Sequence, residues 1–369
     1  MDTVKLEKKL AQASGTTEKI SSPSLDPVIK PSEAMDISRM LLYSHLHRVS
    51  LNTGVEEKQQ IVDDAFKFIP AVVQIGLGFN YFEPVRAAME VSQHIAQALP
   101  LGASPLLQLP RVDSQLVTAL SLRDKEPIRT LQQLLRLDEK ERRKALDRLD
   151  NNSYSQAISI AKKIPLLVVT DVHFKGIFPL LDSVVNLLVT GDKIITPGAI
   201  VQLVFTTGLA TDNDHYSSPK SPSDDKELLS GSESDNEEED VDILTGRKKR
   251  SNDGTPTLIP LAHAPYFPSE HKPVWWAFLA DPRGNRVIVH PTVITDIGVS
   301  PRKWRIQFQA PPQVASYLFQ LHVKSDSYVG VDVVLDVTLQ VHDSKNLEES
   351  VVEEIIPEKG ILSVGDFEC

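Results

Sequence analysis

SYLFQLHVKSDSYVGVDVVLDVTLQVH, residues 316–342, is the stretch of sequence that decides the fold. From position 317 to 324, successive side chains fall alternately on two faces. The same alternation returns from 333 to 341. A period of two with β-branched and aromatic residues is typical of half-buried antiparallel strands. The octapeptide Ser325–Asp332 joins the two predicted strands. The predicted inner faces hold Tyr317, Phe319, Leu321 and Val323, then Val333, Leu335, Val337, Leu339 and Val341.

Further strands are predicted upstream of this stretch. The β-rich segments are residues 166–174, 194–207, 275–279, 286–290 and 304–309. About seven short strands separated by turns favour an immunoglobulin- or fibronectin type III-like β-sandwich. We assign residues 165–343 to this unit, interrupted by a polar insert at 212–255.

The chain before the sandwich is predicted to be helical, which makes the whole an α+β multidomain fold. Apolar residues recur at helical spacing through 33–111, which indicates a helical bundle. Pro70 removes a backbone donor, so a kink or a fresh helix start is expected there. The apolar connector Pro100–Pro110 is expected to lie across a groove.

Residues 112–164 have the pattern of a small helix–loop–helix subdomain. Capping boxes are predicted at Asp138 with Glu141 and at Ser153 with Gln156. Helix–hairpin–helix units that bind DNA backbone look similar, but they usually carry a glycine in the hairpin, and positions 103–175 contain none. Residues 1–32 lack periodicity and are expected to form a flexible or loosely docked lead-in.

The insert at 212–255 and the acidic tail at 344–369 are predicted to be disordered, because they hold too little apolar surface to offset ordering entropy. Arg247–Arg250 follows an acidic block, so the insert is interpreted either as a solvated loop or as a regulated docking segment, with a weaker nuclear-import interpretation. Three serines of the insert each have an acidic residue three positions later, so they are phosphorylation candidates: Ser230, Ser232 and Ser234.

Composition narrows the function classes. A net charge of −11 argues against a general nucleic-acid binder. The single cysteine, Cys369, allows no internal disulfide and fits a reducing compartment. Neither a secretory signal nor an apolar run of about eighteen residues is present. The sequence therefore predicts a cytosolic or nuclear chain, or the soluble part of a longer membrane protein.

The sequence holds no recognisable catalytic constellation, so no enzyme, cofactor or metal is expected. Phosphate-binding glycine loops are absent, and the histidines lack zinc-site spacing. Trp275 and Trp276 have two interpretations. They could form a binding platform, or one of them could belong to the core; we favour the core role for one of them. Asp326 and Asp332 supply too few oxygen ligands for a calcium site. Structural roles at a strand-to-strand corner are therefore predicted for Ser325, Asp326, Ser327, Tyr328, Gly330 and Asp332.

Four motifs in order carry a resemblance to the Sec63 family. They are LLYSHLH at 41–47, SPLLQLP at 104–110, PVWWAFL at 273–279 and the octapeptide SDSYVGVD at 325–332. The insert and the stretch His263–Pro268 are similar to those of fungal members. The resemblance covers residues 32–343.

The resemblance implies a helical bundle, a helix–loop–helix subdomain and a fibronectin type III-like domain. It also implies a protein of the endoplasmic reticulum membrane whose cytosolic part binds the protein-conducting channel and its accessory subunits in post-translational import. Family members carry a lumenal J domain that recruits the chaperone BiP. Here the nearest triplet to its His-Pro-Asp is His290–Thr292, so the chain resembles the cytosolic part alone.

Membrane association would then come only through missing segments or partners, on the cytosolic face. The acidic insert is hypothesised to replace in part the long acidic tail through which family members bind a basic translocon partner. The alternative reading is a scaffold module of a spliceosomal or DNA helicase packed around nucleic acid, because the same module is appended to such enzymes. A free-standing adaptor is a third reading.

Overall fold

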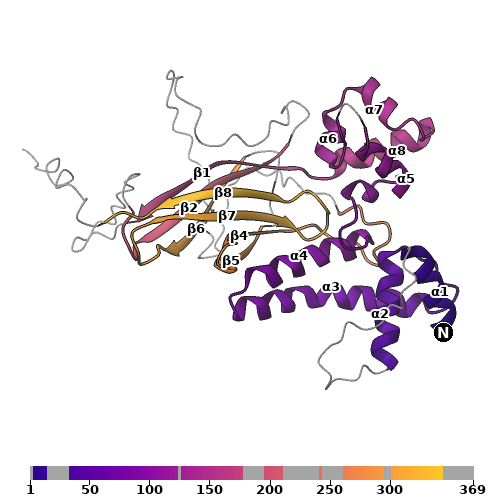
Figure 1. Ribbon diagram of the computed structural model, residues 1–369, viewed down its shortest axis with the longest axis horizontal. Coiled ribbons are helices and arrows are strands. Elements are labelled where there is room, and N and C mark those ends of the chain that lie inside the picture. Colours follow the sequence, from indigo (N-terminus) through magenta and orange to yellow (C-terminus); the bar gives the residue numbers. More distant parts are fainter. Residues whose placement is uncertain are drawn as a thin grey trace, which may run out of the picture.

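The computed structural model has an α+β fold in which two β-sheets lie beside two groups of helices (Figure 1). It describes residues 3–14, 33–123, 126–177, 195–210, 241–242, 261–294, 297 and 301–343. Within these ranges, no helix is both long and apolar enough to cross a membrane.

The strands form two sheets of four. One sheet has the order β1 (Leu167–Ile177), β2 (Ile200–Leu209), β6 (Arg302–Gln309) and β3 (Val241–Asp242). The other has the order β5 (Arg286–Ile294), β4 (Trp275–Asp281), β7 (Ser316–Ser325) and β8 (Val333–Gln340). Neighbouring strands are antiparallel except β3, which runs parallel to β6.

The two sheets share one hydrophobic core. β7 and β8 pair with Leu321 opposite Leu335, so their apolar faces point the same way. Phe319, Leu321, Val323, Val337 and Leu339 are buried there with residues of β1, β2 and β6. The structure thus confirms the faces predicted from the alternation at 317–341.

The helices α3 (Val55–Gly78) and α4 (Phe82–Gln97) cover the other face of the second sheet, and α2 (Glu33–Leu46) packs against these two helices. Trp276, Phe278 and Ala280 of β4 are buried against apolar residues of α3 and α4. Pro70 lies inside α3, which is continuous from 55 to 78, so the expected fresh start there is wrong. Since successive strand residues point to opposite faces, β4 contributes to both the inter-sheet core and the helix–sheet core.

The lead-in predicted for residues 1–32 contains a helix. α1 (Thr3–Ser14) buries Leu6 and Leu10 against Met40 and Leu41 of α2. Leu6 and Leu10 are four positions apart and therefore share one helix face. Of the two expectations for this lead-in, flexible or loosely docked, the packing of α1 differs from the flexible one over 3–14, and the rest of the lead-in lies outside the described residues.

A second helical group follows the connector. The 3₁₀ turn η1 (Pro105–Gln108), α5 (Ser114–Ser121), α6 (Leu131–Arg136), α7 (Glu139–Ala145) and α8 (Asn151–Lys163) surround a core of their own. The Asp138 carboxylate accepts from the Glu141 backbone N–H at 2.6 Å, as a cap should.

The predicted cap at Ser153 is wrong. α8 begins earlier because Asp150 accepts from the backbone N–H groups of Asn152 and Ser153. A full capping box occurs instead at Thr130 and Gln133, at the start of α6.

The insert predicted to be disordered contributes one element, the two-residue strand β3 (Val241–Asp242). Its pairing with β6 differs from the expectation for these two residues. The rest of 212–255 and the tail at 344–369 lie outside the described residues.

Candidate functional site

The loop Ser325–Asp332 between β7 and β8 lies where the sheets meet both groups of helices. We call it the junction loop. Ser325, Asp326, Ser327, Tyr328 and Val331 are all buried, so their side chains are not a docking surface for a partner. The Ser325 hydroxyl accepts from the backbone N–H groups of Ser327 and Tyr328, which makes the loop turn sharply after β7. The junction loop therefore serves the inside of the molecule.

Three glutamine side chains hold the junction loop by its backbone. The Gln93 amide donates to the Ser325 carbonyl at 2.7 Å, the Gln97 amide to the Ser327 carbonyl at 2.7 Å, and the Gln108 amide to the Val329 carbonyl at 2.9 Å. The accepting carbonyls are two residues apart, and Gln93 and Gln97 occupy one face of α4. Buried carbonyls without a partner are costly, so the amides fix the position of the loop against α4 and the connector.

A buried ion pair closes the base of the loop. Lys324 Nζ, whose side chain is 4% exposed, lies 2.6 Å from Asp332 Oδ2 and 3.3 Å from Glu90 Oε1 of α4. Asp332 also accepts from the Gln93 amide and from the Ser325 backbone N–H. A charge is tolerated in such a place only when it is paired and hydrogen-bonded.

Asp326 ties the loop to the segment that leads into β4. Its carboxylate accepts from the Val274 backbone N–H at 3.0 Å, from the Ser327 hydroxyl at 2.5 Å, and lies 2.8 Å from His271 Nε2. Both carboxylates of the octapeptide are thus occupied by protein donors. Among the residues that the structure describes, no group of three or more His, Cys, Asp or Glu side chains is arranged to hold a metal ion.

The far side of the loop enters the core of the second helical group. Tyr328 and Val331 are buried among Leu106, Leu109 and residues of α5, α6 and α8. The Tyr328 hydroxyl accepts a hydrogen bond from the His263 backbone N–H at 2.9 Å, and burial raises the pKa of this phenol. Gly330 has a φ of +75°, and a Cβ added there would lie 2.7 Å from Pro105 Cβ. This position favours glycine for both reasons.

Two further side chains anchor the end of α4. The Arg48 guanidinium donates to the carbonyls of Gln97, Ala98 and Leu107, and it lies 4.4 Å from the ring centre of Tyr266. His45 Nε2 donates to the Ile95 carbonyl at 2.7 Å, and burial lowers the pKa of this imidazole. Carbonyls at a helix C-terminus lack intrahelical partners, so these donors complete the end of the helix.

The two tryptophans face opposite cores. Trp275 is completely buried between the sheets, and Trp276 is 8% exposed and lies among residues of α3 and α4. Neither ring is placed as an exposed binding platform.

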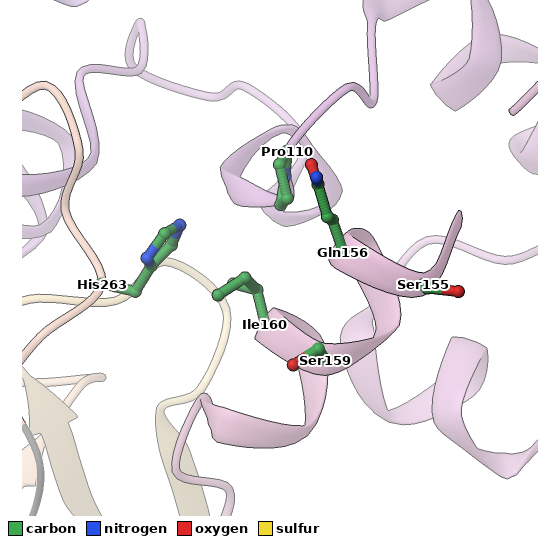
Figure 2. Close-up of a pocket in the computed structure, with 6 residues that line it drawn as sticks. All are labelled: Pro110, Ser155, Gln156, Ser159, Ile160 and His263. Atoms are coloured by element: carbon green, nitrogen blue, oxygen red, sulfur yellow. The ribbon is translucent and has the colours of Figure 1, made fainter. Parts of the chain in front are cut away.

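A cavity of about 440 Å³ lies between α8, Pro110 and His263 (Figure 2). In Figure 2, Gln156 of α8 points toward Pro110, and Ile160 points toward His263. Burial lowers the pKa of His263, and Lys163 lowers it further. The cavity is open to solvent, and Ser155 and Ser159 also line it. His263, whose backbone N–H donates to the Tyr328 hydroxyl, forms one of its borders.

The sequence pointed to the octapeptide but missed the side chains that hold it. Gln93, Gln97, Gln108, Arg48 and Lys324 were not among the predicted residues. The available signal was two amides four positions apart, Gln93 and Gln97, beside the apolar face of α4. Polar groups at such positions indicate a buried hydrogen-bonding partner. The predicted phosphorylation candidates Ser230, Ser232 and Ser234 lie outside the described residues.

Comparison with known proteins identifies the family. The model of the Sec63 Brl domain matches residues 38–338. The translocation protein sec63 of Schizosaccharomyces pombe is 34% identical over 86% of this chain, and the protein translocation protein SEC63 of Saccharomyces cerevisiae is 21% identical over 84%. The chain spans 48% and 47% of the lengths of these two proteins.

Helicases also match. The human U5 small nuclear ribonucleoprotein 200 kDa helicase is 22% identical over 94% of this chain, which spans 13% of that protein. The match to the fission yeast translocation protein has the higher identity. Because the domain model covers most of the chain, from within α2 to within β8, this chain belongs to the Sec63 family.

Proposed function

We propose that this chain is a non-enzymatic scaffold of the endoplasmic reticulum translocation complex, which binds the protein-conducting channel on the cytosolic face and supports post-translational import. The observation that carries the proposal is the 34% identity to a translocation protein over 86% of the chain. The junction loop supports a scaffold role, because its polar groups form hydrogen bonds that join the sheets to the helices and do not line a reactive cleft.

The finer architecture belongs to the same proposal. We assign residues 33–111 to a helical bundle, 112–164 to a helix–loop–helix subdomain and 165–343 to a fibronectin type III-like sandwich. Two sheets around one core, antiparallel apart from the short strand β3, support the sandwich assignment. The core around η1 and α5–α8 includes Leu106 and Leu109, so it supports a boundary within the connector, a few residues before 112.

The channel and its accessory subunits are the proposed partners, through exposed loops of the sandwich. Val314, in the loop between β6 and β7, is 56% exposed and is a suitable probe of such a contact. Bilayer contact comes, in this proposal, through partners or other segments. Phosphorylation of Ser230, Ser232 and Ser234 is a proposed means of regulation, and the acidic insert a proposed docking segment.

A helicase-type scaffold that packs around nucleic acid is the second candidate. The observation in its favour is that a helicase matches 94% of the chain. The net charge of −11 disfavours it, because nucleic-acid contacts depend mainly on basic surfaces.

Co-purification tests the proposal. The tagged chain is incubated with endoplasmic reticulum membranes solubilised in mild detergent, and the channel subunits are quantified in the eluate. We expect enrichment of the channel by the unmodified chain and a loss of it with Val314→Glu. Leu122→Glu, at an apolar position after α5 that is 73% exposed, is the control and retains the channel.

Failure of the unmodified chain to enrich the channel would contradict the proposal. Binding to single-stranded RNA or DNA at physiological salt, with no channel recovered, would favour the helicase-type scaffold instead.

A further inference from the structure

The outward face of α3 carries an apolar stripe that the described parts of the chain leave uncovered. Phe68, Val72, Ile75 and Phe79 are 66%, 47%, 63% and 69% exposed. Their spacing of four, three and four residues places them on one side of the helix. Tyr81, 53% exposed, extends the stripe, because its ring stacks on Phe79 at 6.2 Å. α3 uses its opposite face, with Ile69, Val73 and Leu77, for the internal core.

The stripe has no charged residue beside it. Positions 68–82 contain none, and the other exposed positions of this segment are Pro70, Ala71, Gln74, Gly78 and Asn80. Interfaces between soluble proteins normally have a polar rim around an apolar centre. A face without charges can instead enter the boundary between lipid headgroups and acyl chains without the desolvation of a charged group.

The size of the stripe argues against a second copy of the chain as its occupant. Five side chains at these exposures present roughly 500–600 Å². A stable protein–protein interface needs about 800 Å² on each partner. A bilayer surface has no such threshold, because it needs no matching patch.

Basic and aromatic groups lie at the ends of the stripe. Phe79 and Tyr81 line a cavity of about 400 Å³ with Asn80, Gly284, Asn285 and Arg286. Arg286 and Arg283 are exposed at this end, and Lys67 is exposed at the other. The flanking acids Asp63 and Glu83 are paired with Lys67 and Arg86, and Asp64, four positions before Phe68, accepts a hydrogen bond from the Gln60 amide. Aromatic rings with nearby Arg and Lys are characteristic of segments that lie in the membrane interface.

We propose that the outward face of α3 is a membrane-docking surface: Phe68, Val72, Ile75, Phe79 and Tyr81 enter the headgroup region of a phospholipid bilayer, and Arg283 and Arg286 contact lipid phosphates. In Figure 1, α3 lies on the side of α4 that faces away from β7, and the stripe lies opposite the α3 face that joins the helix–sheet core. This goes beyond the proposed function, in which bilayer contact comes only through partners or other segments.

Vesicle flotation tests the proposal. The purified 369-residue chain is mixed with vesicles of phosphatidylcholine and phosphatidylinositol and floated through a density gradient. We expect the chain to float, and Ile75→Ser with Phe79→Ser to weaken partitioning at least about tenfold, because two side chains leave the bilayer. Leu101→Ser with Leu122→Ser, which removes two comparably exposed leucines elsewhere, leaves flotation unchanged.

A local readout guards against a folding defect. Cys369 is the single cysteine, so Cys369→Ser allows a polarity-sensitive fluorophore to be attached at Ile75→Cys or at Leu122→Cys. The emission at position 75 shifts to the blue on addition of vesicles, and the emission at position 122 does not. Equal responses at both positions, or no flotation of the unmodified chain, would overturn the proposal.

A protein partner on the same face is the remaining outcome. If the Ile75→Ser and Phe79→Ser variant lost the channel in detergent but still floated with vesicles, the stripe would be a protein-binding surface and the lipid proposal wrong. Channel recovery in detergent involves no bilayer, so failure of membrane docking and failure of the proposed channel binding are measured separately.

Discussion

At the scale of single residues, the junction loop combines backbone conformation with close packing. Gly330 adopts a positive φ, and the space beside its Cα is filled by Pro105. Gly102 has a similar φ of +76° but open space around it. The pair separates the effect of conformation from the effect of contact, because both residues lie outside regular helices and strands.

We predict that Gly330→Ala lowers the free energy of unfolding by about 3 kcal/mol, the sum of a left-handed conformation and an overpacked contact. Gly102→Ala should lower it by only about 1 kcal/mol, because conformation alone opposes the methyl group. Urea denaturation of both variants measures the difference. Equal effects would mean that the junction loop moves freely away from Pro105.

His322 is a polar residue in an apolar place. Its ring stacks on Phe278 at 4.9 Å, and both ring nitrogens are buried without a hydrogen-bond partner. Burial, with Lys324 and Arg86 adding repulsion, lowers its pKa to about 4. The unfolded chain therefore binds this proton more readily than the folded chain does between about pH 4 and the ordinary histidine pKa.

The folded state should consequently lose about 2 kcal/mol of stability through His322 when the pH falls from 7 to 5. His322→Phe should remove this loss and raise stability at pH 7 by about 1 kcal/mol, because two unpaired polar atoms disappear. Denaturation midpoints at the two pH values test this. His290→Phe, at an exposed position, is the control and should keep the pH dependence; an unchanged slope in His322→Phe would contradict the prediction.

At the scale of elements, the sequence predicted strands better than helix ends. Alternation fixed β7 and β8 and their inner faces, because one face of each strand is apolar over its whole length. The strand expected at 194–207 begins at Ile200, because Thr196–Ala199 form a hydrogen-bonded turn in which Gly198 has a positive φ.

Helix starts were harder because several polar residues compete for each cap. Asp150 rather than Ser153 caps α8, and α1 was missed because its stability depends on two leucines that meet α2. Of the candidate site, the sequence indicated the octapeptide and the two tryptophans. It did not indicate Gln108 or Arg48, because their roles arise only when the connector folds back on the loop.

The capping box of α6 gives a prediction at this scale. Thr130→Ala should lower the free energy of unfolding by about 1 kcal/mol, because the Gln133 backbone N–H loses its acceptor. Ser153→Ala, at the position where a cap was expected from the sequence, should change it by less than about 0.5 kcal/mol. Thermal or urea unfolding of both variants decides; a larger effect at Ser153 would restore the sequence-based assignment.

At the scale of the whole molecule, the sandwich depends on the helices beside it. Trp276, Phe278 and Ala280 of β4 and Val287 of β5 are covered by α3 and α4, and Tyr328 and Val331 by the second helical group. Cutting the chain near residue 165 would expose all of these side chains to water. Contiguous apolar surface of this kind promotes aggregation.

We therefore predict that a fragment of residues 165–343 is aggregated or binds hydrophobic dyes, whereas a fragment of residues 1–343, which keeps α1 on α2, is monomeric. Size-exclusion chromatography with light scattering compares the two. A monomeric shorter fragment with native tryptophan fluorescence would show that the sandwich is an autonomous unit and that the helices only rest on it.

The two faces of β4 have a mechanical consequence. One strand is built into the inter-sheet core by Trp275 and into the helix–sheet core by Trp276, and the amides of Gln93 and Gln97 join α4 to the loop that follows the adjacent strand, β7. A force applied to the sandwich would thus act at the same time on both cores and on the two glutamine hydrogen bonds. The helices and the sheets would therefore rotate as one rigid body, so a rotation of one part would move the other part by the same angle.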